Sequence, residues 1–191
     1  MDYKKLFNRI LLILTKPSEA WVQIKPEGKQ EVITTFVYPL LAISSLAVFI
    51  GALFSTAEDK AYSVFSVALT ECSTKVISLF GGVYLACFIA EKLTEYILKI
   101  NVNRSISLKL VGYGFVLIFL ETILVSLLPD FRLIAYILQF YGVFILWEGM
   151  PICIKHEEEQ RLKLTLIFFF SIFIAPLLIQ LIFSKMINFM N

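Results

Sequence analysis

The sequence predicts an all-α membrane protein, a bundle of five transmembrane helices with an amphipathic interfacial helix at its amino-terminal end. Hydrophobic residues make up 59% of the 191 residues, and most of them fall in five long apolar stretches. A helix needs about 20 mainly apolar residues to cross the hydrocarbon core of a bilayer. Because each stretch is continuously apolar and does not alternate with polar residues, helices are predicted and barrel strands are excluded.

The first element is an amphipathic helix predicted over residues 2–14. Apolar residues such as Leu6 recur there at helical spacing, while Lys4, Lys5 and Arg9 take the other face. We expect this helix to lie in the headgroup plane, where the three basic residues face anionic lipid. Packing of the helix against the cytoplasmic face of the bundle is the alternative.

Residues 1–32 are predicted to form a cytoplasmic helix and linker, and residues 33–191 a transmembrane domain. The five spans are expected at about 33–54, 73–97, 110–128, 133–153 and 164–187. The second span is the least well defined, because its unbroken apolar part is only Val76–Ala90. The moderately apolar stretch Ala61–Leu69 either extends this span or lies on the outer surface. Pro176 predicts a kink within the fifth span.

The distribution of basic residues predicts the orientation. Thirteen of the 17 Lys and Arg residues precede the first span or lie in the loops after the second and fourth spans. Cytoplasmic loops carry such an excess. We therefore expect a multi-pass protein of the cytoplasmic membrane, with its amino terminus in the cytoplasm and its carboxyl terminus outside.

Several function classes are excluded by composition and motifs. A net charge of +2 does not favour binding to nucleic acid. Cys72, Cys87 and Cys153 lack the spacing of a metal site, and His156 has no second histidine four positions later, as a zinc protease helix requires. No serine-nucleophile motif occurs either. We predict no enzymatic activity, no metal and no cofactor.

Three polar residues are expected to meet inside the membrane. Counting along the helices from the outer loops places Glu121, Gln139 and Gln180 at one depth. Polar groups within a bilayer are costly unless they are paired or hydrated, so they mark functional sites. The three residues predict a hydrogen-bonded layer, which is either a structural clasp or a proton or ion site. Near the cytoplasmic ends of the spans, Glu148 is expected to form an ion pair with Lys92 or Lys155.

The second span carries a small residue at every fourth position. Such a pattern forms a groove into which another helix can pack closely. Whether that helix belongs to the same chain or to a second subunit is left open by the pattern. The groove residues are Ser78, Gly82, Ala86 and Ala90.

Across nearly its whole length the chain resembles the Yip1-domain family of five-span membrane proteins. The resemblance rests on short motifs in a fixed order. They are Lys16-Pro17-Ser18-Glu19-Ala20-Trp21, Tyr38-Pro39-Leu40, Gly51, Gly112-Tyr113-Gly114, Leu127-Leu128-Pro129, Tyr141-Gly142 and Trp147-Glu148-Gly149. The short, compact form is similar to the bacterial branch of the family. Eukaryotic relatives bind prenylated GTPases, but this chain lacks their long polar amino-terminal extension, so that activity is not carried over.

Together, these features favour a non-enzymatic membrane protein that binds partner proteins or organises lipid through its helix bundle. Anionic headgroups, a second copy of the chain or another membrane protein are the expected partners. The alternative is a small transporter or channel, proton-linked through Glu121.

Overall fold

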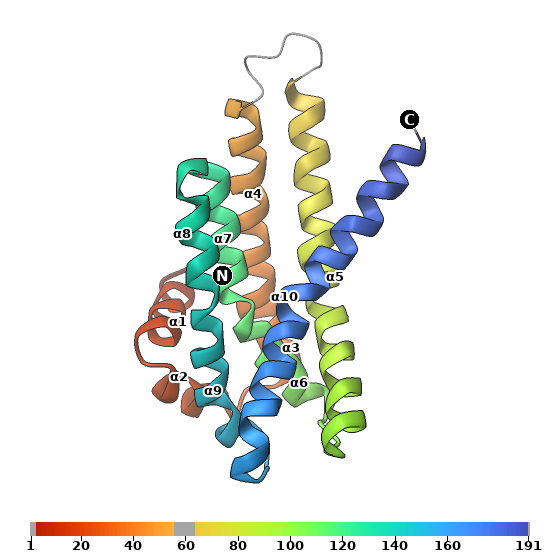
Figure 1. The fold of residues 1–191 in the computed structure, drawn as a ribbon. Helices are drawn as coiled ribbons and strands as arrows, with labels where there is room; N and C mark the ends of the chain where they lie inside the picture. The colour runs from red at the N-terminus through yellow and green to blue at the C-terminus, as the bar shows by residue number, and fades with distance from the viewer. Residues whose placement is uncertain (1–2, 56–63, 191) are drawn as a thin grey trace.

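The structure is a computed structural model that describes residues 3–55 and 64–190, with side chains described as far as Met186. Within these ranges every regular element is a helix (Figure 1). The elements are α1 (Tyr3–Thr15), α2 (Pro17–Ile24), α3 (Lys29–Val32), η1 (Ile33–Val37), α4 (Tyr38–Ser55), α5 (Val64–Leu98), α6 (Arg104–Gly114), α7 (Val116–Leu127), η2 (Pro129–Phe131), α8 (Arg132–Gln139), α9 (Tyr141–Cys153) and α10 (Glu158–Met190).

Five helical stretches in the described ranges are long and apolar enough to cross a membrane. They are Lys29–Ser55, Val64–Leu98, Arg104–Leu127, Pro129–Cys153 and Glu158–Met186. The predicted all-α fold with five transmembrane helices is therefore confirmed, and the chain is a multi-pass membrane protein.

The second span is longer than its apolar core suggested. Helix α5 begins at Val64 and continues to Leu98, so residues 64–69 extend this span and do not lie across the outer surface. Residues 61–63 of the same predicted stretch lie outside the described residues. The helix ends where Lys99 adopts a positive φ of 57°, a left-handed conformation typical of helix carboxyl ends.

The helices approach one another closely where small residues allow it. A Cβ atom added to Gly51 of α4 would overlap the backbone oxygen of Ser126 on α7. Any larger side chain at position 51 would therefore collide with the backbone of the neighbouring helix. Gly51 thus sets the spacing of the α4–α7 pair, which packs along the upper half of the bundle in Figure 1.

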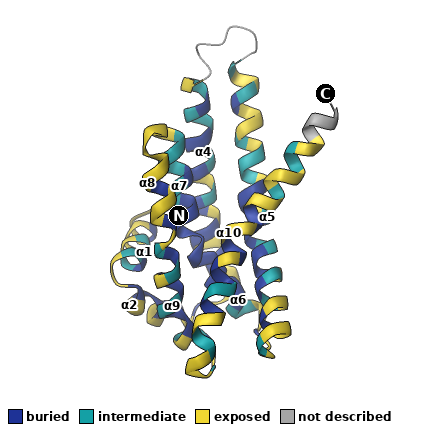
Figure 2. Ribbon diagram, in the orientation of Figure 1, coloured by how far each residue is buried: buried dark blue, intermediate teal, exposed yellow. Residues whose placement is uncertain are grey.

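Buried and exposed residues separate along the molecule. The buried residues gather in the lower half of the bundle in Figure 2, where fully buried aromatic side chains such as Trp21, Tyr113 and Phe168 form the core. Large apolar side chains are exposed on α8 and α10, including Leu133 and Ile182. Contiguous exposed apolar surface of this kind marks contact with lipid in a protein of this class.

Candidate functional site

Helix α2 is fixed against α9 by a tryptophan and a glycine. Pro17 occupies the first turn of α2, a position where its missing N–H is not needed. One turn later the fully buried Trp21 donates its indole N–H to the Ile145 carbonyl over 2.8 Å. The Trp21 ring lies directly over Gly149, where an added Cβ would be 2.5 Å from Cε2 of the ring. Two of the short sequence motifs therefore meet at this seam.

Glu148 lies at the same seam but does not take the expected partners. Its carboxylate accepts a hydrogen bond from the hydroxyl of Ser18 at the start of α2. Lys92 instead pairs with Glu95, one turn further along α5, at 3.0 Å. Among the described residues, no ion pair joins Glu148 to Lys92 or to Lys155. Glu148 thus has its partner on α2, and Lys92 has its partner on its own helix.

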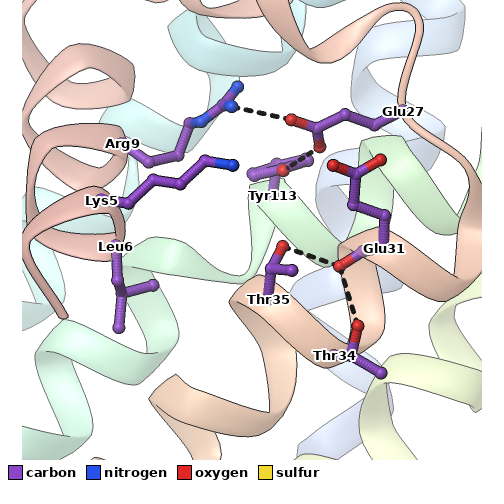
Figure 3. A pocket seen from close by; sticks show the side chains of 8 residues that line it. All are labelled: Lys5, Leu6, Arg9, Glu27, Glu31, Thr34, Thr35 and Tyr113. Carbon is purple, nitrogen blue, oxygen red and sulfur yellow. Dashed lines mark hydrogen bonds and ion pairs between the residues drawn. The ribbon is translucent and has the colours of Figure 1, made fainter. Parts of the chain in front are cut away.

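A charged cavity of about 470 Å³ opens between α1 and the start of the first span (Figure 3). At its centre Arg9 Nη2 lies 2.7 Å from Glu27 Oε1, and the Tyr113 hydroxyl donates to the other oxygen of Glu27. This bridge ties together α1, the linker before α3, and α6. Burial makes such a network costly to disrupt, because a lost partner leaves a polar group unsatisfied.

Arg9 departs from the lipid-facing role expected of it. Its side chain is only 16% exposed and points into the bundle. The reason is helical phase: Leu6, Arg9 and Ile13 share one face of α1, and Leu6 and Ile13 are buried. Lys4 and Lys5 are both exposed, but only Lys5 lines the charged cavity, beside Arg9. The interfacial placement of α1 remains a prediction.

Glu27 and Tyr113 were not identified as site residues from the sequence. Glu27 stands in a short linker beside Pro26 and Gly28, where no periodic pattern indicates which way a side chain points. From the sequence, Tyr113 was noted only as the middle residue of the Gly112-Tyr113-Gly114 motif. The one available signal was the position of Arg9 on the buried face of α1, since a buried cation requires an acidic or acceptor partner.

The predicted intramembrane polar residues surround one cavity of about 250 Å³. Glu121, Gln139 and Gln180 all line it, together with Lys75 and Tyr136. Gln139 is 8% exposed, and its Oε1 has no hydrogen-bond partner in the described part of the chain. Glu121 accepts a weak bond of 3.4 Å from the Thr122 hydroxyl. This cavity is lined by polar side chains, and the Gln139 amide oxygen still needs a hydrogen-bond donor. A ligand, an ion or water would therefore fit there.

A second cavity lies next to Glu121 and Gln139, on the side of α8. It has a volume of about 360 Å³, and Glu121 and Gln139 also contribute to its lining. Its remaining walls are mainly leucine side chains from α1, α7 and α8, including Leu14 and Leu117. Glu121 therefore separates a polar cavity from an apolar one.

The small-residue groove of α5 receives a helix of the same chain. Ser78 donates a hydrogen bond of 2.7 Å to the Pro176 carbonyl, and a Cβ at Gly82 would lie 3.0 Å from the Cβ of Pro176. Ala86 and Ala90 are fully buried further down the helix. Around Ser78 and Gly82 the groove is filled by α10, whose carboxyl-terminal half leaves the bundle beyond Pro176 (Figure 1).

Among the described residues, no three or more His, Cys, Asp and Glu side chains form a group that could hold a metal ion. In a comparison with known families, the model of the Yip1 domain matches residues 11–180, which is most of the chain. No curated protein and no solved structure matches the chain.

Proposed function

Because the chain belongs to the Yip1-domain family, we propose that it is a non-enzymatic membrane protein that organises lipid in the cytoplasmic leaflet through α1. The observation that carries this proposal is an apolar stripe on a helix that is already docked. Tyr3, Phe7 and Leu11 follow one another at four-residue intervals and are 64%, 59% and 43% exposed.

The contacts of α1 with the bundle make this stripe a fixed feature. Leu6 and Ile13 are buried beneath it, Arg9 is bridged to Glu27, and the Tyr141 hydroxyl donates to the Leu14 carbonyl over 2.9 Å. A helix held in this way cannot turn its outer stripe toward the protein. In a membrane protein the remaining apolar environment is lipid, into which such stripes insert at the interface.

The charge distribution supports a cytoplasmic location for this helix. Thirteen of the 17 basic residues lie on the side of α1, which is the excess typical of cytoplasmic segments. Lys4 is exposed next to the stripe, where it is available to anionic headgroups. Attraction of this kind contributes about 1 kcal/mol per lysine near an anionic surface.

The test is lipid selectivity around the reconstituted protein. Trp21 and Trp147 serve as energy donors to a small fraction of pyrene-labelled lipid, either anionic phosphatidylglycerol or zwitterionic phosphatidylcholine. Transfer to the anionic lipid should be greater and should fall to the level of the zwitterionic lipid in Lys4→Glu. Lys185→Glu, an exposed residue near the opposite end of the chain, is the matched control. Equal transfer to both lipids in the wild type would refute the proposal.

Transport is the second candidate, favoured by the polar cavity that Glu121, Gln139 and Gln180 line. In that case Glu121 would carry a proton or cation through the outer half of the bundle. Glu121→Gln keeps the size of the side chain and removes its charge. If the protein transports, this change should abolish an ion or proton flux in liposomes; if it organises lipid, wild type and variant should both show only background leakage.

A further inference from the structure

One wall of the charged cavity presents hydrogen-bond donors. Lys5 and Arg9 line it from α1 (Figure 3). Glu27 accepts from Arg9 Nη2 with one oxygen and from Tyr113 with the other. Arg9 Nη1 is buried and has no hydrogen-bond partner within the residues that the structure describes. The guanidinium therefore keeps an unmet need for an acceptor after its bridge to Glu27 is formed.

The opposite wall presents acceptors. Glu31, Thr34 and Thr35 line it from α3 and from η1, a π-helix at the start of the first span. The Thr34 hydroxyl donates to the Gln30 carbonyl over 2.9 Å, and the Thr35 hydroxyl to the Glu31 carbonyl over 2.7 Å. With their hydrogens committed, both hydroxyl oxygens offer only lone pairs. Short π-helical turns are frequent at functional sites.

The two walls together describe a ligand with two charges. Two cations and two carboxylates line the cavity, so its formal charge is zero, and neither a lone anion nor a lone cation matches both walls. A ligand that carries a phosphate and an ammonium group does match them. Its phosphate would meet Lys5 and Arg9, and its ammonium would meet Glu31 and the threonine oxygens. The cavity volume of about 470 Å³ lies within the range of small-molecule sites.

We propose that this cavity binds the headgroup of a phospholipid with a primary ammonium group, the chemistry of phosphatidylethanolamine. The lipid source follows from position, because Thr34 and Thr35 stand at the beginning of a transmembrane span, where headgroups lie. This site is separate from the outer stripe of α1. It adds a specific lipid site to the general lipid contact proposed above.

The test measures thermal stabilisation of the full-length protein in detergent on addition of defined lipids. Phosphatidylethanolamine should raise the melting temperature at a lower concentration than phosphatidylglycerol, which has no ammonium, or phosphatidylcholine, whose quaternary ammonium donates no hydrogen bond. Lys5→Gln and Glu31→Gln should each weaken this effect about tenfold, since each removes one charge-assisted contact. Both residues lie outside the Arg9–Glu27–Tyr113 bridge, so the variants are expected to fold. Lys29→Gln, which changes an exposed lysine outside the cavity, is the control.

Three outcomes would count against this site. Equal stabilisation by all three lipids, or an unchanged response of both variants, would overturn the proposal. Soluble phosphoethanolamine that stabilises as strongly as the lipid would overturn the lipid assignment. None of these results would alter the selectivity expected at Lys4, so failure of this site and failure of the proposed function are distinguishable.

Discussion

Gly149 offers the sharpest single-residue test of the seam between α2 and α9. In Gly149→Ala the new methyl group would lie 2.5 Å from Trp21 Cε2 and 2.8 Å from Cδ2, far inside contact distance. Trp21 is fully buried, so the ring can move aside only by displacing the side chains packed around it. Overpacking of this kind costs about 1–3 kcal/mol. Displacement of the ring would also lose its hydrogen bond to Ile145, worth about 1 kcal/mol.

An opposing effect must be subtracted. Replacing glycine by alanine inside a helix stabilises it by about 1 kcal/mol. The net expectation is a loss of about 1–3 kcal/mol in the free energy of unfolding. The assay is unfolding by sodium dodecyl sulfate in mixed micelles, followed by tryptophan fluorescence, since Trp21 is one of only two tryptophans.

A matched control lies on the same helix. A Cβ at Gly142 would meet its nearest neighbours at 3.4–3.6 Å, which is ordinary contact. Gly142→Ala should therefore be neutral or slightly stabilising. In a Trp21→Phe background, where the ring is smaller, Gly149→Ala should cost less than in the wild type. If Gly149→Ala is as stable as Gly142→Ala, the proposed seam is refuted.

Two further predictions concern the other contacts that hold the bundle together. Glu27→Gln should destabilise the fold by roughly 2 kcal/mol in the same assay, because it leaves Arg9 partly buried without its ion pair. The double change of Arg9 and Glu27 to Met should recover most of that loss, and an equally unstable double variant would contradict the account. Gly82→Leu should destabilise by about 3 kcal/mol or more through collision with the backbone of Pro176, read out as loss of monodisperse protein on size exclusion. Wild-type elution and stability for that variant would exclude the α5–α10 packing.

The transmembrane architecture could be predicted from the sequence because it depends on continuity and length alone. Twenty apolar residues in a row have few structures available in lipid, whichever neighbours they meet. The extension of α5 to Val64 was left open because Ala61–Leu69 is too mixed in polarity to identify by hydrophobicity. Residues 64–69 are assigned to the second span because they continue the same helix, α5, without a break.

The candidate sites depended on different information. Glu121, Gln139 and Gln180 could be grouped because depth in a membrane helix follows from counting residues, and the structure places them around one cavity. Partners across the bundle could not be assigned in this way. Arg9 pairs with Glu27, which lies in a linker. Glu148 pairs with Ser18, which lies on α2, a helix that does not span the membrane. Such contacts depend on how α1 and α2 dock, which no periodic pattern encodes.

Lipid organisation through α1 requires that this helix is docked to the bundle with its outer stripe in lipid. The direct measurement is photocrosslinking with benzoylphenylalanine in place of Phe7 in native membranes, followed by mass spectrometry of the purified protein. Phe36, which is 1% exposed, provides the buried control position. We expect phospholipid adducts at position 7 and crosslinks within the protein at position 36. Crosslinks from position 7 to protein alone, with no lipid adduct, would contradict the account.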